Sequence, residues 1–128
     1  MNTNIKLGHT TIDSHHQVLL KLFENLKKSS QENDFKIVET ISLDMTKYAL
    51  EHFRYEEELM MQAKYPDDLL EEHMVQHALF KAKMIDVMKK LKNKEIDHDL
   101  QEYIKNWFIV HIKIVDKKLV DYIDKNKI

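Results

Sequence analysis

The spacing of four side chains in the middle of this sequence is suited to binding a metal ion. His52 and Glu56 are four residues apart, and so are His73 and His77. Residues four apart on an α-helix point to the same side, because they differ by only about 40° around the helix axis. Imidazole nitrogens and carboxylate oxygens are common ligands of transition metals. The spacing therefore predicts a metal site that two neighbouring helices share.

Two further candidates, His111 and Asp116, lie near the end of the chain. They are five residues apart, or roughly 140° around an α-helix, so they can share a site only if that site is wide. A site with two metal ions and a bridging carboxylate is wide. A histidine near the start of the first helix would complete a ring to which each helix contributes. Periodicity does not choose between His15 and His16, and the apolar stripe of that helix leans slightly towards His15.

Other interpretations of these histidines fit less well. A single histidine on an apolar helix face is usually a core residue that is bonded to a backbone carbonyl. Five of them together with two acids would leave several polar groups unsatisfied, at about 1–3 kcal/mol each. His73-x-x-x-His77 has zinc-protease spacing but lacks the glutamate of that motif. Carboxylate-rich di-iron bundles need two inward Glu-x-x-His pairs, and only Glu95-Ile96-Asp97-His98 is present, in a predicted turn.

Composition restricts the class of protein that can position these residues. With 128 residues, 43% of them apolar and 33% charged, the chain is expected to form one soluble domain. Cysteine is absent, which excludes disulfides and thiolate metal sites. A net charge of −2 and a single arginine give nucleic-acid binding little support. The chain shows no signal-peptide pattern and no run of transmembrane length, so we expect a cytoplasmic protein without membrane insertion.

The first part of the chain is predicted to be an arm followed by a helix. Residues 1–13 show no sustained periodicity and are expected to be extended. Ser14-His15-His16-Gln17 fits a capping box at the start of the first helix, which should end near Lys28. Residues 29–34 are polar and should form a loop, in which Asn33 or Asp34 caps the second helix.

Apolar residues then recur at steps of three or four along three further predicted helices. Pro66 ends the second helix, because proline has no backbone N–H to donate and restricts the residue before it. Asp67 or Asp68 can cap the third helix, with Glu71 completing a capping box for the latter. A charged turn over residues 92–97 leads to the fourth helix.

Four amphipathic helices joined by short polar loops favour an all-α fold. One glycine and one proline are too few for the many tight turns of a sheet protein. We therefore expect an up-down-up-down antiparallel four-helix bundle with an extended N-terminal arm. The arm (1–13) and the bundle (about 14–125) would form a single domain over residues 1–128.

Four motifs together resemble the hemerythrin family, in particular its single-domain bacterial members. They are His52-Phe53-x-x-Glu56-Glu57-x-Leu59-Met60, Tyr65-Pro66, His73-x-x-x-His77 and Trp107-x-x-x-His111-Ile112-x-x-x-Asp116. The match covers nearly the whole chain from Ile12 to Asp116, and the joint spacing is highly specific. The family pattern Asp-x-x-His, followed three residues later by an aliphatic residue, fits Asp13, His16 and Leu19 and selects His16 over His15.

The resemblance implies a non-heme di-iron centre with a bridging oxo or hydroxo group. The implied ligands are His16, His52, Glu56, His73, His77, His111 and Asp116. By the same resemblance, one iron has three histidine ligands (His73, His77 and His111), the other has His16 and His52, and both carboxylates bridge. Leu19, Phe53, Trp107 and Ile109 are expected to keep water away, whereas His9 and His98 are expected to be exposed and without a role.

The implied ligand set leaves one position open on the iron with two histidines, and open positions are where small ligands bind. The resemblance therefore implies reversible dioxygen binding, for transport, storage or delivery, rather than catalysis. One alternative is a di-iron enzyme that reduces peroxide or nitric oxide. Another is an oxygen or iron sensor that acts through a separate partner protein.

Overall fold

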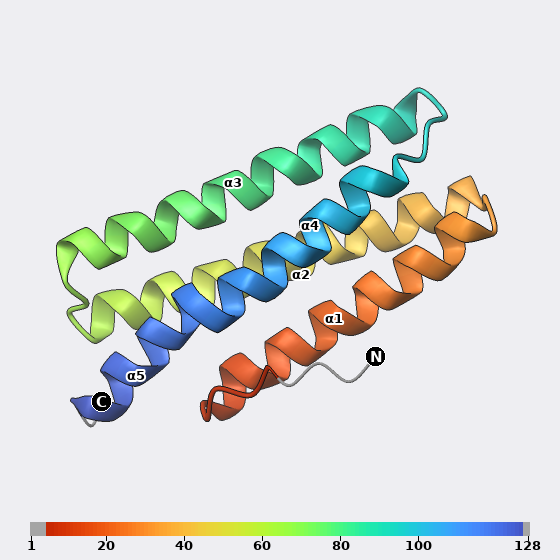
Figure 1. The fold of residues 1–128 in the computed structure, drawn as a ribbon. Helices are drawn as coiled ribbons and strands as arrows, with labels where there is room; N and C mark the ends of the chain where they lie inside the picture. The colour runs from red at the N-terminus through yellow and green to blue at the C-terminus, as the bar shows by residue number, and fades with distance from the viewer. Residues whose placement is uncertain (1–4, 127–128) are drawn as a thin grey trace.

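The computed structural model describes residues 5–126, which form an antiparallel helical bundle (Figure 1). Its segments are α1 (Thr10–Gln31), α2 (Phe35–Gln62), α3 (Asp67–Lys92), α4 (His98–His111), the π-helical η1 (Ile112–Asp116) and α5 (Lys117–Lys125). The last three follow one another along a single rod, so α1, α2, α3 and this rod make up the four-helix bundle. The all-α, up-down-up-down fold predicted from the sequence is confirmed.

The first helix begins earlier than predicted, at Thr10 instead of Ser14. His9 caps it, since its Nδ1 accepts the backbone N–H of Ile12 at 3.2 Å. The capping box at Ser14 and the exposed, inactive His9 are therefore wrong predictions. Both errors have the same cause. The imidazole of His9 satisfies a free N–H group of the first helical turn, so the helix begins before Ser14. The helix also continues past Lys28 to Gln31.

The arm ahead of α1 is tied to the bundle, because the carboxylate of Asp13 accepts the backbone N–H groups of Leu7 and Gly8 at 2.9 and 3.1 Å. Gly8 has a φ of +96°, a conformation that residues with a Cβ rarely adopt. The turn there allows Ile5 to be buried in the core. The arm therefore packs against the bundle.

Other helix ends test the predicted caps. Asp34 caps α2 as expected, accepting the N–H of Ile37 at 3.2 Å. The caps predicted at Asp67 or Asp68 are wrong, since Pro66 is the capping residue and no side chain takes part. Both aspartates instead lie in the first turn of α3, where carboxylates are favoured by the helix dipole.

The core consists of two apolar clusters with a polar layer between them. One cluster includes Leu19, Phe53, Phe80, Phe108 and Ile112, and the other includes Ile12, Met60, Tyr65, Leu119 and Val120. Along every helix the candidate ligands fall between residues of the first cluster and residues of the second. Among the described residues no helix is both long and apolar enough to cross a membrane. The cytoplasmic location stays a prediction.

Replacing Lys94 by glycine is expected to stabilise the fold. Lys94 follows α3 with a φ of +61°, and glycine adopts this conformation without the steric cost of a Cβ, about 1 kcal/mol. The free energy of unfolding, measured by urea titration, should rise by about that amount. Lys21→Gly, on an exposed position inside α1, is the matched control and should lower it by about 1 kcal/mol. Equal losses in both variants would contradict this explanation.

Candidate metal centre

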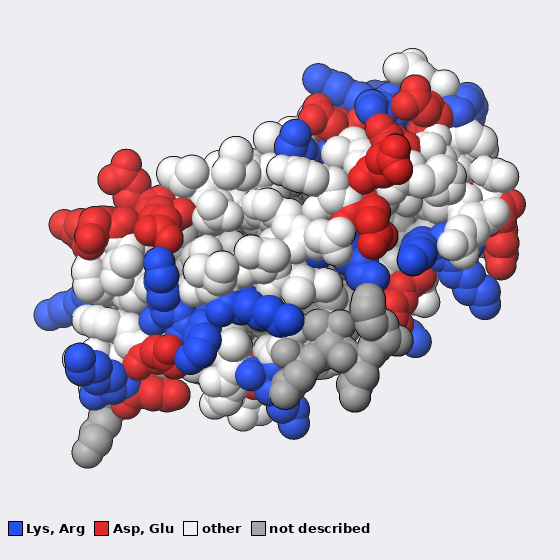
Figure 2. Space-filling model, viewed as in Figure 1, with Lys and Arg blue, Asp and Glu red and all other residues white. Residues whose placement is uncertain are grey.

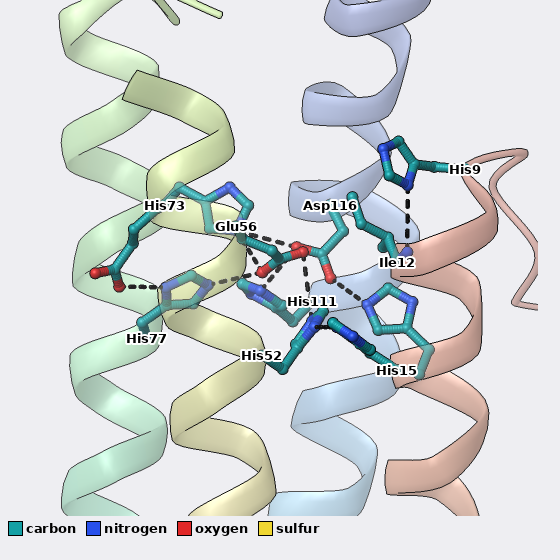
Figure 3. A network of polar contacts seen from close by, with 11 residues as sticks. His9, Ile12, His15, His52, Glu56, His73, His77, His111 and Asp116 are labelled. Carbon is teal, nitrogen blue, oxygen red and sulfur yellow. Dashed lines mark hydrogen bonds and ion pairs between the residues drawn. The ribbon is translucent and has the colours of Figure 1, made fainter. Parts of the chain in front are cut away.

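Two groups of buried, ligand-type side chains meet in the polar layer. One group consists of Glu56, His73, His77, His111 and Asp116, and the other of His16, His52, Glu56 and Asp116. Within each group, one ligand atom per residue lies within 4.8 Å of all the others. Figure 3 shows the imidazoles reaching from opposite sides towards the two carboxylates. The structure thus brings together all seven residues that the sequence singled out.

The carboxylate of Asp116 faces both groups with different oxygens. Its Oδ1 lies 3.0 Å from Nε2 of His73 and 3.2 Å from Nε2 of His111. Its Oδ2 lies 2.9 Å from Nε2 of His16. One oxygen therefore belongs to the group with three histidines and the other to the group with two.

Glu56 repeats this division from the opposite side of the layer. Its Oε1 lies 3.4 Å from Nε2 of His73 and 3.1 Å from Nε2 of His77, whereas its Oε2 lies 3.4 Å from Nε2 of His52. Each of the two carboxylates thus directs one oxygen to the first group and one to the second. Carboxylates that bridge two cations need this arrangement.

A π-helical turn places Asp116 in this site. In η1 the backbone N–H of Lys117 reaches the carbonyl of Ile112, five residues back. In a π-helical turn, two residues that are five positions apart lie about one turn apart on the same side of the helix. Asp116 therefore lies on the same side as His111. The two do share a site as predicted, but the premise that they lie roughly 140° apart is wrong because the helix is not α-helical there. π-turns of this kind are frequent at functional sites.

The residues present fit a metal ion. All seven candidates are at most 2% exposed. The Nε2 atoms of His16, His52, His73 and His111 and both oxygens of Asp116 are buried without a hydrogen-bond partner among the described residues, so their short contacts are not aligned as hydrogen bonds. Nε2 of His77 differs, since it is hydrogen-bonded to Oε1 of Glu56 at 3.1 Å. Unsatisfied polar atoms cost about 1–3 kcal/mol each. A cation at the centre of each group would satisfy them together.

The charges of the site point the same way. Burial opposes ionisation of Glu56, but the neighbouring imidazoles, led by His52, hold the pKa of its carboxyl well below the usual range. Burial likewise opposes protonation of His73, yet contact with the Asp116 and Glu56 carboxylates raises its pKa to about 9. The two buried carboxylates are therefore stabilised by positive charge. In the metal-free protein this charge comes from protons on the imidazoles, and a bound cation can replace those protons.

Two residues outside the predicted ligand set orient the imidazoles. Oε2 of Glu57 lies 2.9 Å from Nδ1 of His77, and Nδ1 of His15 lies 2.8 Å from Nδ1 of His52. A partner at Nδ1 fixes the ring so that Nε2 faces the centre. Sequence reasoning missed Glu57, whose only signal is its place beside Glu56 in the motif.

The structure also separates His15 from His16. His16 is fully buried and belongs to the second group of ligand atoms. His15 is half-buried and belongs to neither group, and among the described ligand residues its hydrogen bond and ring contact are with His52. The family pattern, which selected His16, therefore agrees with the geometry better than the apolar stripe did.

Two aromatic rings stack on imidazoles of the site. Phe53 lies parallel to His77 with ring centroids 4.0 Å apart, and Trp107 lies parallel to His111 at 5.0 Å. These rings and the fully buried Leu19 form part of the apolar surroundings that the sequence predicted. Packing of this kind limits the access of water and restricts rotation of the imidazoles.

The family model described as the hemerythrin HHE cation binding domain matches residues 7–123. The chain belongs to the hemerythrin family. The cluster of histidines and carboxylates described above fits the cation site after which the family model is named. The resemblance inferred from the four sequence motifs is thereby confirmed.

Curated relatives agree with this membership, and a solved structure agrees with the fold. The chain is 22% identical over 121 residues to a bacteriohemerythrin of Stenotrophomonas maltophilia, covering 94% of this chain and 78% of the relative. It is 23% identical over 119 residues to a bacteriohemerythrin of Pseudomonas aeruginosa, with coverages of 92% and 76%. The fold also matches a crystal structure of a leucine-to-phenylalanine mutant with a TM-score of 0.77, 23% identity and coverages of 84% and 82%.

Deleting Lys113 from this hemerythrin should preserve the site. Lys113 and Ile114 are the exposed residues of η1, and without one of them a regular α-helix would carry His111 and Asp116 four apart on one face. The thermal midpoint and the metal content after ferrous loading should stay close to those of the parent. Deletion of Glu102, an exposed residue inside α4, is the control. It should lower both the thermal midpoint and the metal content, because it rotates Phe108 and His111 by about 100° around the helix axis relative to the start of α4. Loss of metal in the Lys113 deletion would contradict this description of the turn.

Proposed function

We propose that this hemerythrin holds two iron ions in the cluster and binds dioxygen reversibly, as a carrier, store or delivery agent. The division of the ligand atoms into two groups that share Glu56 and Asp116 carries the proposal. His73, His77 and His111 would hold one iron, His16 and His52 the other, and the shared carboxylates would bridge them. When bound, a ferrous pair supplies the electrons that dioxygen takes up.

The two groups differ in a way that suits a small ligand. One has three histidines and the other has two, so the iron on the side of His16 and His52 would keep a position free for dioxygen. Apolar rings border this side: Phe108 lies 5.8 Å from His16 and Phe53 lies 6.0 Å from His52, between ring centroids. Exclusion of water by such rings disfavours loss of the electrons to solvent-assisted oxidation.

A second candidate function is the reduction of peroxide or nitric oxide, which needs protons at the open position. The structure places the half-buried Tyr48 and Tyr55 with ring centroids 5.8 and 5.3 Å from that of His15, which contacts His52. Burial and then the neighbouring His52 lower the pKa of His15, which favours the neutral imidazole, a form that can relay a proton. No comparable observation favours a sensor with a separate partner.

Oxygenation and purging of the reduced protein distinguishes the two functions. Protein loaded with ferrous iron without air should contain two irons per chain and develop a visible band in oxygen that disappears on purging. Irreversible oxidation with rapid turnover of added peroxide would contradict carriage and support the enzyme. A single metal ion per chain would contradict both.

His16→Ala and His15→Gln form a matched pair of variants on adjacent residues. His16→Ala removes a proposed ligand, so iron content should fall from two towards one per chain and the reversible band should be lost. His15→Gln removes no proposed ligand, and the glutamine amide can still offer a polar partner to Nδ1 of His52, so both irons and the band should remain. If the protein is instead a reductase that uses His15 in proton transfer, the same change should lower turnover by 10²-fold or more. Equal iron loss in both variants would contradict the assignment of His16.

A further inference from the structure

The outer face of α3, on the side away from His73 and His77, carries a second regular pattern. Eight exposed residues follow one another at alternating steps of three and four, and we call this row the α3 seam: Asp68, Glu71, Val75, Ala78, Ala82, Ile85, Lys89 and Lys92. Steps of three and four are the spacing of a coiled-coil contact, in which a second helix covers the row. Val75 and Ile85 are 51% and 54% exposed, although they are large apolar residues.

The α3 seam is complementary to a second copy of itself that runs in the opposite direction. Two acids come first, four apolar residues follow, and two lysines close the row. In two copies of α3 packed antiparallel about a two-fold axis midway between Ala78 and Ala82, Asp68 would face Lys92 and Glu71 would face Lys89. In the same register Val75 would face Ile85, and Ala78 would face Ala82. Every position of the row meets a residue of matching chemistry.

We propose that the α3 seam is an interface through which two copies of this chain pair as an antiparallel dimer. A two-fold interface must be self-complementary, and the seam satisfies this over its full length of about 36 Å. The alanines at its centre permit close approach of the two helices. A groove beside the seam, lined by Leu70, Met74, Val75 and Ala78 among others, offers space for Ile85 of the second copy.

The helix dipole explains only part of the pattern. It favours acids in the first turn of a helix and lysines in the last, but it does not require four apolar residues on the solvent side between them. The four charged residues of the seam form no ion pair with any other residue of the described chain, 5–126. Their charges are thus available to a second copy.

Figure 2 shows the distribution of charge at the two ends of this helix. Acidic side chains gather at the left, where α3 begins, and lysines lie at the upper right, where it ends, together with further acidic side chains. Mainly uncharged surface separates them. A second copy turned by 180° would bring each charged end against the opposite one.

Sedimentation equilibrium of the iron-loaded protein tests the dimer. The parent should sediment as a dimer at micromolar concentration. In Glu71→Lys the two Glu71–Lys89 contacts of the dimer become repulsive, and the dissociation constant should rise about tenfold or more at low ionic strength. Lys89→Glu should have the same effect. The double variant Glu71→Lys with Lys89→Glu should restore the dissociation constant of the parent. In that variant each contact again joins one lysine and one glutamate, with their positions exchanged.

Controls separate the interface from general effects of charge and folding. Glu24→Lys makes the same reversal on an exposed position of α1 and should leave the dimer unchanged. Circular dichroism should show parent-like helix content in every variant. A monomer at all concentrations would overturn the proposal. So would a dimer that the single reversals leave intact, or one that the double variant fails to restore.

Discussion

Glu56 and Asp116 place two carboxylates at the centre of the bundle, where neither residue has any exposed surface. Buried charges of this kind are costly unless opposite charges or ligands surround them. Five imidazoles provide those surroundings, and each carboxylate divides its oxygens between the same two groups of histidines. The positions of the helices follow from this requirement, because every one of them must present its ligand-type side chains to a single layer.

The apolar core packs against the polar layer on both sides. One cluster lies above it and one below it along the bundle, so the cluster of ligands is held between two packed regions. Phe53 and Trp107 stack directly on imidazoles, and Glu57 and His15 hold the Nδ1 atoms of two others. Removing a metal from such a layer leaves its geometry supported by packing but its buried polar atoms unsatisfied. Metal binding should therefore contribute to the stability of the fold.

Local spacing made much of this structure predictable. Residues four apart share a helix face in any surroundings, so His52 and Glu56 could be paired from the sequence alone. The π-turn before Asp116 could not, because it depends on packing of the residues on either side against the other helices. Glu57 gave no periodic signal, since its partner His77 lies 20 residues away on the next helix. The cap of α1 was missed because histidine is an unusual capping residue.

The direct test of the proposed centre is a crystal structure of the ferrous-loaded protein, with anomalous scattering recorded on both sides of the iron absorption edge. Two iron peaks are expected in the polar layer. One should lie between His73, His77 and His111, the other beside His16 and His52, with an oxygen of Glu56 directed at each. A single peak, or peaks whose anomalous signal does not change across the iron edge, would contradict the di-iron centre.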